Sequence, residues 1–531
     1  MRLNLGEIAQ CMGCGPNGVL WDGLSSNGGL GRANAAAPTS LKDLAAARSG
    51  SGKPMETPLG SASNWSFAPW SQITPTGARI DSRQVKPGDL FFCLPGENVD
   101  GHTFAATAMA AGASAVIASR NPFDDAPPVE LMHTPVFLVE DVTKALWQIA
   151  TCHRNTSPAR IIGLTGTAGK TSVKEVLSQV LEIRGRTERN PLNLNNQIGL
   201  PLSMLNASAD ASFWVMEMGI SHAHDMDELG SILKPDIGII LNVGDGHVAG
   251  LGDMGVAAYK ARLLDYIQPG GMAIVSADYP DLTEQVNTRR MALAQKGIQL
   301  LHFSARNTDV YCSARYTGPS GLGGGMYEVT WADGMRMELA TPFRSDYGSE
   351  NMAAIMAVAQ KLLLTVSEIK MGLANAKLPQ QRFRAEQYVD HTLLDDSYNA
   401  NPLSSGRMIQ AARDMADESG LPLVLVMGEM LELGDVSDSA HENLGMQMAA
   451  SCPEAVFWKG GQHEAVKRGL HKQGYKGLFN QVEGPEDFTR LLDEIPLPRA
   501  LVLFKGSRSN HLEQLVDVFK AKIGERKVNA L

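Results

Sequence analysis

The feature that most constrains this chain is a glycine-rich turn between an apolar strand and an amphipathic helix. The turn follows the apolar run RIIGL and consists of Gly166, Thr167, Ala168, Gly169, Lys170, Thr171 and Ser172. The apolar residues after it recur at i, i+3, i+4, i+7 and i+8, the spacing of one helix face, at Val173, Val176, Leu177, Val180 and Leu181. A strand, a glycine turn and a helix in this order predict a phosphate-binding loop, because glycines let backbone N–H groups converge at a helix N-terminus.

Two side chains of this turn carry the predicted chemistry. Lys170 is expected to bridge the terminal phosphates of a nucleotide, and Thr171 to place its hydroxyl on Mg²⁺. The strict eight-residue pattern has glycine where this chain has Leu164, so the strand and helix around the turn support the prediction more than the pattern does.

Candidate metal ligands follow two further apolar runs, FWVMEM at 213–218 and IGIILNV at 237–243. Glu217 ends the first run, which would place a carboxylate at the carboxyl edge of a parallel sheet beside the loop. The alternative is a solvated glutamate at a strand end. His247 follows the second run, but a lone histidine is more often structural than a ligand.

The rest of the chain predicts an α/β protein of three domains with parallel sheets. We expect an N-terminal domain over 1–158, a central P-loop domain with a doubly wound sheet over 159–385, and a C-terminal Rossmann-like domain over 386–531. Residues 1–14 predict a short strand and helix. Residues 15–72 are rich in Gly, Ser, Asn, Ala and Pro and predict a flexible insertion. In the last helix, one face carries Leu512, Leu515, Val516 and Phe519.

Charge and composition exclude several classes of function. A formal net charge of -10 argues against nucleic-acid binding, and no apolar stretch is long enough to span a membrane. The N-terminus lacks the apolar core of a secretory signal. Six cysteines scattered through the chain predict free thiols in a reducing, cytoplasmic compartment. Cys11 and Cys14 form an isolated CxxC, which predicts metal or redox use only weakly.

Seven motifs, in order, resemble the Mur ligase family. GTAGKTS, NPLNLNNQIGLPLSML at 190–205, EMG at 217–219 and NVGDGH at 242–247 resemble its central domain. LLDDSYNANPLS at 393–404, MGEMLELGDVSDSAHENLG at 427–445 and KGSR at 505–508 resemble the branch that adds D-alanyl-D-alanine to UDP-N-acetylmuramoyl tripeptide. The resemblance covers residues 72–525 and the first fourteen.

This resemblance implies a cytoplasmic ATP- and Mg²⁺-dependent ligase of peptidoglycan synthesis, acting as a monomer. ATP phosphorylates the terminal carboxylate of the UDP-linked tripeptide. The amine of D-alanyl-D-alanine then attacks the acyl phosphate and expels phosphate. The implied architecture has an N-terminal UDP-binding domain, a central P-loop domain and a C-terminal Rossmann-like domain.

The resemblance also assigns roles to individual residues. Glu217, His247 and Lys260 match metal ligands, Lys260 after carbamylation. Asn351 matches the residue that reads adenine, and Arg382 and Asp396 match contacts to phosphates and ribose, with Tyr398–Pro402 beside them. The matches to substrate-binding residues are Ser82, Arg83, Asn193, Asn195, Asn196, Lys505 and Arg508.

The chain departs from the family pattern at Tyr347, Gly348 and Ala249, where a His-Asn pair and an acidic residue are common. Two alternatives stay open. One is a Mur-type ligase that adds a single amino acid. The other is a P-loop nucleotide switch, which would not need Glu217, His247 and Lys260.

Overall fold

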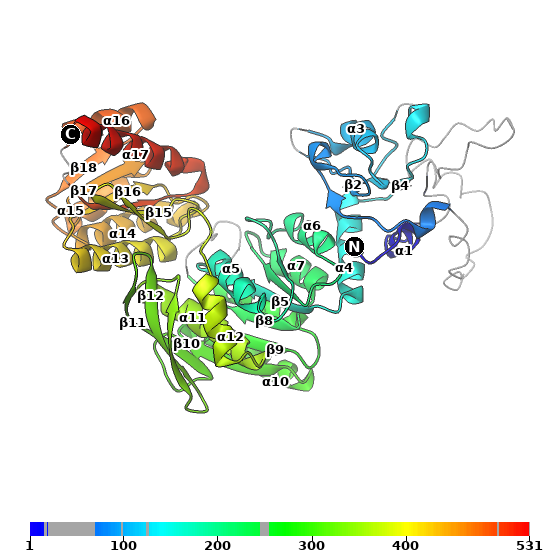
Figure 1. Ribbon diagram of the computed structural model, residues 1–531, viewed down its shortest axis with the longest axis horizontal. Helices are drawn as coiled ribbons and strands as arrows, with labels where there is room; N and C mark the ends of the chain where they lie inside the picture. Colours follow the sequence, from blue (N-terminus) through cyan, green and yellow to red (C-terminus); the bar gives the residue numbers. More distant parts are fainter. Residues whose placement is uncertain are drawn as a thin grey trace, which may run out of the picture. The chain divides into compact units, whose positions relative to one another are not determined.

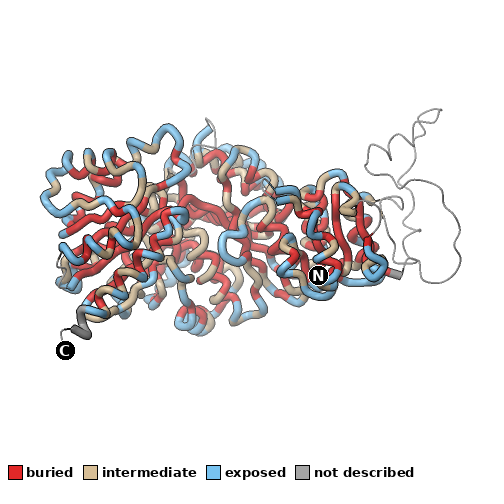
Figure 2. The backbone as a smooth tube through the Cα atoms, turned by 90° about the horizontal axis from the view of Figure 1, so that it is seen from above, coloured by how far each residue is buried: buried red, intermediate tan, exposed pale blue. Residues whose placement is uncertain are grey.

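The computed structural model describes residues 1–14, 19, 69–96, 99–123, 127–244, 254–495 and 499–529. These residues form two compact units (Figure 1). The first comprises Met1–Ala159, Asn190–Ala211 and Ser231–Leu233, and the second Arg160–Arg189, Ser212–Gly230 and Lys234–Leu531. In each unit buried residues form the interior and exposed residues the surface (Figure 2). No described helix combines the length and hydropathy that a membrane span requires.

The first unit is built on a four-stranded parallel sheet in the order β1-β2-β3-β4. β2 and β3 are buried at every position, as expected of parallel strands covered on both faces. The strands are β1 (Ala78–Arg79), β2 (Leu90–Phe92), β3 (Ala115–Ala118) and β4 (Val136–Leu138). The helices are α1 (Leu5–Cys11), η2 (Pro69–Gln72), η3 (Ser82–Gln84), η4 (Gly101–Phe104), α3 (Ala105–Ala110), η5 (Val129–Leu131), α4 (Val142–Thr156) and α6 (Gly199–Asn206).

Two predictions for this unit need correction. Residues 1–4 form no strand; instead Asn4 caps α1 by a capping box with Glu7, so the helix begins at once. Most of the predicted insertion at 15–72 lies outside the described residues, but its end does not. Trp70 in η2 is buried and its ring packs edge-on against Phe137 at 5.3 Å, so 69–72 belong to the fold.

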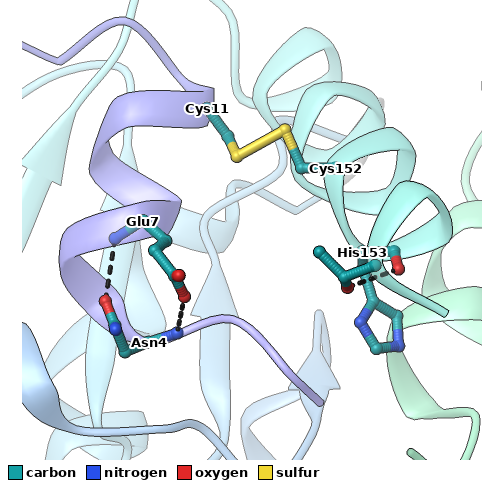
Figure 3. Close-up of a disulfide and its surroundings, with 6 residues drawn as sticks. Asn4, Glu7, Cys11, Cys152 and His153 are labelled. Atoms are coloured by element: carbon teal, nitrogen blue, oxygen red, sulfur yellow. Dashed lines mark hydrogen bonds between the residues drawn. A yellow bond between two sulfur atoms is a disulfide. The ribbon is translucent and has the colours of Figure 1, made fainter.

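The cysteines also differ from prediction. Cys11 of α1 and Cys152 of α4 form a disulfide, with Cα atoms 6.4 Å apart (Figure 3). The two cysteines are 141 residues apart in sequence, so the pairing arises from the packing of α1 on α4. Free thiols were therefore the wrong prediction for this pair, and the CxxC does not act as a unit. Cys14 is free, and its thiol donates to the carbonyl of Leu138 at 3.6 Å.

The second unit contains a nine-stranded sheet in the order β13-β12-β11-β10-β9-β8-β5-β7-β6. Strands from β6 to β11 pair in parallel, whereas β11, β12 and β13 form an antiparallel extension that the sequence analysis did not predict. The strands are β5 (Arg160–Thr165), β6 (Thr187–Arg189), β7 (Phe213–Glu217), β8 (Ile237–Ile240), β9 (Met272–Ser276), β10 (Gln299–Ser304), β11 (Cys312–Ser320), β12 (Gly324–Trp331) and β13 (Arg336–Thr341).

One face of this sheet is covered by α5 and the helices beside it. The five apolar residues predicted on one face of α5 are all fully buried in a single core, which also contains residues of α11 and α12. Each such side chain contributes about 1.5–3 kcal/mol relative to exposure. The helices are α5 (Lys170–Leu181), α7 (Asp225–Leu233), α9 (Gly255–Ala261), η6 (Arg262–Tyr266), α10 (Pro280–Gln295), α11 (Tyr347–Lys361) and α12 (Val366–Asn375).

The third sheet has the order β14-β15-β19-β16-β17-β18, parallel except for β14. A separate core covers each face, and the four apolar residues predicted on the last helix lie together in one of them. The strands are β14 (Arg384–Tyr388), β15 (His391–Asp396), β16 (Leu423–Gly428), β17 (Ala455–Lys459), β18 (Leu478–Gln481) and β19 (Leu501–Lys505). The helices are α13 (Pro402–Ser419), η7 (Gly434–Val436), α14 (Ser437–Ala450), α15 (His463–Lys472), α16 (Pro485–Glu494), η8 (Arg508–Asn510) and α17 (Leu512–Asn529).

Candidate active site

The predicted phosphate loop joins β5 to α5 at the point where the strand order of the nine-stranded sheet changes direction. β5 lies between β7 and β8, so the carboxyl ends of three neighbouring strands meet at this edge. In parallel α/β sheets, ligands bind at such a switch point. The loop, Glu217 after β7 and Asn242 after β8 all lie here.

Gly169 shapes the loop. Its φ of 80° is left-handed, and a Cβ there would lie 2.6 Å from the amide oxygen of Asn351. Any other residue would therefore be strained and would clash. No described side chain caps α5 at Gly169, so N–H groups of its first turn remain for an anionic ligand.

Asn242 holds the backbone of the loop. Its side-chain oxygen accepts hydrogen bonds from the N–H groups of Thr167 and Ala168 at 2.9 and 2.8 Å, and its side-chain nitrogen donates to the carbonyl of Ala168 at 3.0 Å. The hydroxyl of Thr167 donates to the carbonyl of Gly244 at 3.2 Å. These bonds fix the first half of the loop before any ligand binds.

Two lysines meet at one carbonyl of the loop. The amine of Lys170 donates to the carbonyl of Gly166 at 2.8 Å, and the amine of Lys260, from α9, donates to the same oxygen at 3.0 Å. Burial lowers the pKa of Lys170, and the positive charge of Arg382 acts in the same direction. Burial, followed by the charge of Lys170, holds the pKa of Lys260 well below its usual range, although Glu217 opposes the shift. The arrangement therefore favours a neutral amine at Lys260.

Glu217 and Thr171 form the candidate metal position. Glu217 is 3% exposed at the end of β7, and its carboxylate accepts a hydrogen bond from the hydroxyl of Thr171 at 2.9 Å. A buried carboxylate beside a hydroxyl is an oxygen donor set of the kind that Mg²⁺ prefers. The described residues contain no cluster of three or more His, Cys, Asp and Glu side chains that could hold a metal. The predicted ligand His247 lies outside the described residues, and so does Ala249, where the chain departs from the family pattern.

The predicted nucleotide contacts of the third sheet lie together. The guanidinium of Arg382 stacks over the ring of Tyr398 at 4.3 Å, and that of Arg508 approaches the same ring at 5.8 Å. Arg382 is flanked by Gln381 and Phe383, which both have positive φ, a conformation that costs free energy and needs support from its surroundings. Hydrogen bonds from the Tyr398 N–H to the carbonyl of Gln381 and from the Phe383 N–H to Asp396 provide that support.

Asp396 and Lys505 form a buried ion pair at 2.6 Å. Lys505 is 1% exposed and also donates to the carbonyl of Asn399 at 2.9 Å. Burial lowers its pKa, and Asp396 opposes the shift. Both were predicted as ligand contacts, yet in this structure each is engaged by the other. Arg508, by contrast, is largely exposed and pairs with Glu513 at 3.5 Å.

The predicted substrate residues of the first unit are held by short-range bonds. Asp81 caps η3 and pairs with Arg83 at 2.8 Å, while Ser82 is buried. The hydrogen bonds from the Arg83 side chain and N–H lower the pKa of Asp81 to about 2.

Three asparagines lie in the loop before α6. The side chain of Asn196 accepts hydrogen bonds from the N–H groups of Ile198 and Gly199, so it caps the first turn. The carbonyl of Asn193 accepts from the N–H of Asn195 at 2.7 Å, and Asn193 is exposed. The structure thus shows a local structural role for Asn196 beside its predicted role in substrate binding.

Sequence reasoning missed Asn242, Glu350 and Arg407. Glu350 is 2% exposed on α11, and its carboxylate accepts hydrogen bonds from Asn242 at 2.8 Å and from Arg407 of α13 at 3.0 Å. One available signal was a glutamate two residues before the apolar run MAAIMAVA, because a buried carboxylate needs a partner.

A phosphate loop at a sheet switch point, with a buried carboxylate on the next strand, defines a P-loop nucleotide-binding protein. Comparison with known proteins refines that class. Residues 164–359 match the Mur ligase middle domain, and residues 75–154 match the catalytic domain of the Mur ligase family. The UDP-N-acetylmuramoyl-tripeptide–D-alanyl-D-alanine ligase of Escherichia coli is 30% identical over 453 residues, which cover 84% of this chain and 94% of that protein. The chain belongs to the Mur ligase family.

Two solved structures agree. MurF from Acinetobacter baumannii is 28% identical, with a TM-score of 0.71, and the match covers 83% of this chain and 92% of that one. MurF ligase from Thermotoga maritima in complex with ADP is 25% identical, with a TM-score of 0.71, covering 85% and 98%. The three-domain α/β architecture of the Mur ligases is therefore confirmed for this chain, whereas the domain boundaries remain predictions.

Proposed function

We propose that this protein is an ATP-dependent amide ligase that joins D-alanyl-D-alanine to UDP-N-acetylmuramoyl tripeptide. The products are UDP-N-acetylmuramoyl pentapeptide, ADP and phosphate, and the reaction belongs to cytoplasmic peptidoglycan precursor synthesis. The observation that carries the proposal is the match to a ligase of that specificity over 94% of its length, together with a complete phosphate loop beside Glu217 and Lys260.

The phosphate loop performs the first half of the reaction. Lys170 and the N–H groups of the first turn of α5 bind the β- and γ-phosphates of ATP and orient the γ-phosphate toward the substrate carboxylate. Thr171 and Glu217 fit Mg²⁺ by donor chemistry, and His247 completes the proposed ligand set. When bound, Mg²⁺ neutralises charge on the phosphates.

Lys260 supplies a second anionic group in this proposal. Its neutral amine attacks CO₂, the nitrogen loses a proton, and the product is a carbamate. The lowered pKa of the amine favours this step, because only the unprotonated nitrogen is a nucleophile. An unmodified, protonated lysine at the same position would repel a cation.

The remaining predicted residues bind the ends of the substrates. Asn351 lies against Gly169 and is proposed to contact adenine, while Arg382 and Asp396 contact the phosphates and ribose. Ser82 and Arg83 hold the UDP end of the acceptor, and Lys505 and Arg508 bring positive charge toward the incoming dipeptide. For the peptide of the acceptor we propose contacts from Asn193, Asn195 and Asn196.

The test is acceptor-dependent phosphate release. Purified protein is supplied with ATP, Mg²⁺ and UDP-N-acetylmuramoyl tripeptide, and D-alanyl-D-alanine or single amino acids are added in turn while the product mass is recorded. We expect release only with the dipeptide, and a UDP-linked pentapeptide. Release with a single amino acid and a shorter UDP-linked acceptor would identify a sister ligase, and hydrolysis indifferent to every acceptor would identify a nucleotide switch.

A further inference from the structure

A chain of hydrogen bonds runs from helix α13 to the phosphate loop through buried side chains. Arg407 of α13 donates to Glu350 of α11 at 3.0 Å, Asn242 donates to the same carboxylate oxygen at 2.8 Å, and Asn242 holds the N–H groups of Thr167 and Ala168. We propose that Arg407 and Glu350 are positioning residues that hold the phosphate loop in its nucleotide-binding conformation. The inference rests on nucleotide use in the proposed function.

The chemistry of an amide explains why Glu350 matters to the loop. Asn242 must present its oxygen to two loop N–H groups and its nitrogen to two acceptors, the carbonyl of Ala168 and the carboxylate of Glu350. A carboxylate only accepts hydrogen bonds, so Glu350 selects the amide orientation that serves the loop. The reversed amide would point its N–H groups at the two loop donors.

Arg407 supplies the cationic partner of that carboxylate. Glu350 is 2% exposed, and a buried carboxylate is costly unless it is paired and hydrogen-bonded. Arg407 also donates to the hydroxyl of Tyr279 at 2.7 Å, which fixes its guanidinium beside Glu350.

Helix α13 also contacts residues around the nine-stranded sheet near its two ends. At its N-terminus, the side chain of Asn401 donates to the carbonyl of Thr167 at 3.2 Å. At its C-terminus, Glu418 pairs with the buried Arg344. Arg407 reaches the loop through Glu350 and Asn242, and Asn401 reaches it directly, whereas Glu418 pairs with Arg344. The Glu418 contact therefore separates a loop-specific effect from general docking of the helix.

The experiment compares nucleotide binding and catalysis across matched variants of the full-length protein. Calorimetric titration with ADP gives the affinity independently of any acceptor, so it separates this inference from the proposed ligase activity. The variants are Arg407→Gln, Arg407→Lys, Glu350→Gln, and the double variant Arg407→Gln/Glu350→Gln. The controls are Glu418→Gln and Arg413→Gln, the latter on the same helix but paired with Asp417 of that helix.

We expect Arg407→Gln to weaken ADP binding and raise KM for ATP roughly tenfold, with a smaller change in kcat, and Arg407→Lys to recover part of the loss. The double variant should be no worse than the poorer single variant, because both act through one chain of contacts. Should Glu350→Gln fail to fold, the ADP affinity of Arg407→Gln still tests the inference, because Arg407 is at the partly exposed end of this series of hydrogen bonds. An ADP affinity of Arg407→Gln equal to that of Arg413→Gln, or an equal loss in Glu418→Gln, would overturn the inference.

Discussion

Some predicted functional residues of the two units differ in how they are held. In the second unit Glu217, Lys260 and Lys505 are 1–3% exposed and bonded to residues distant in sequence. In the first unit, the side chain of Arg83 is 87% exposed and its ion pair is with Asp81, two residues away. The difference matches two tasks. Groups that stabilise developing charge gain from a fixed, low-dielectric setting, whereas groups that capture one end of a large substrate can stay solvated until it arrives.

Within the second unit, two buried lysines have amines that are bonded to different kinds of group. Lys505 pairs with Asp396 at 2.6 Å, whereas the Lys260 amine donates a hydrogen bond to the carbonyl of Gly166. The carboxylate of Asp396 favours the charged form of Lys505 and opposes the effect of burial on its pKa. Lys260 lies beside a second lysine, and burial and that charge hold its pKa well below its usual range although Glu217 opposes the shift, so a neutral amine is favoured there.

The largest expected effects test the chemical role proposed for the Lys260 amine. Lys260→Ala should lower kcat about 10²–10³-fold, because it removes the proposed anionic group beside the transferred phosphate. A short carboxylate such as acetate, added to the assay, should restore part of the activity by taking the place of the carbamate.

Lys170→Ala is the matched control for this rescue. It should abolish turnover, and acetate should not help, because the proposed role of Lys170 is that of a cation. Full activity of Lys260→Ala without any additive would contradict the carbamate role.

Lys505→Met should reduce stability as well as remove the positive charge proposed to act on the incoming dipeptide. It leaves Asp396 buried without its partner, which costs about 3–5 kcal/mol in the free energy of unfolding. Urea unfolding measures this, and adding Asp396→Asn should recover part of the loss because the unpaired charge is gone. Arg508→Gln, at an exposed pair, should change stability by under about 0.5 kcal/mol. If Lys505→Met and Arg508→Gln lost the same free energy of unfolding, burial would not explain a difference between the two ion pairs.

How much of this site could be predicted from the sequence depends on where in the sequence the interacting residues lie. The loop and the buried face of α5 were predictable because all their determinants lie within residues 160–181. Glu217 could be placed because the carboxyl ends of parallel strands share one edge. The pair of Glu350 and Arg407 could not, because its partners are 57 residues apart on two helices and neither helix periodicity nor motif identifies the other. The disulfide of Cys11 escaped prediction for the same reason.

Arg83 provides the corresponding test in the first unit. Arg83→Gln should raise KM for the UDP-linked substrate about 10–100-fold through loss of a charge-assisted contact, with kcat and KM for ATP nearly unchanged. Stability should hardly change, since the ion pair with Asp81 is exposed. Arg120→Gln is the control, because this half-exposed arginine pairs with Asp100 and has no predicted contact with substrate. An unchanged KM for the UDP-linked substrate would remove Arg83 from the site.

The smallest effect concerns the partly buried thiol of Cys14 in the first unit. Burial raises the pKa of Cys14 to about 11, so its thiolate is scarce at pH 8 and its alkylation by iodoacetamide should be slow. Below that pKa the thiolate fraction rises about tenfold for each pH unit, so the rate at pH 10 should be roughly a hundredfold higher. The exposed Cys452 is the internal reference and should be labelled first at pH 8. Mass spectrometry of peptides follows the label at each cysteine, first without reductant and then with it. Cys11 and Cys152 should take up label only after reduction. Labelling of Cys14 as fast as Cys452 at pH 8 would show that this part of the first unit is as open to solvent as the turn that carries Arg83.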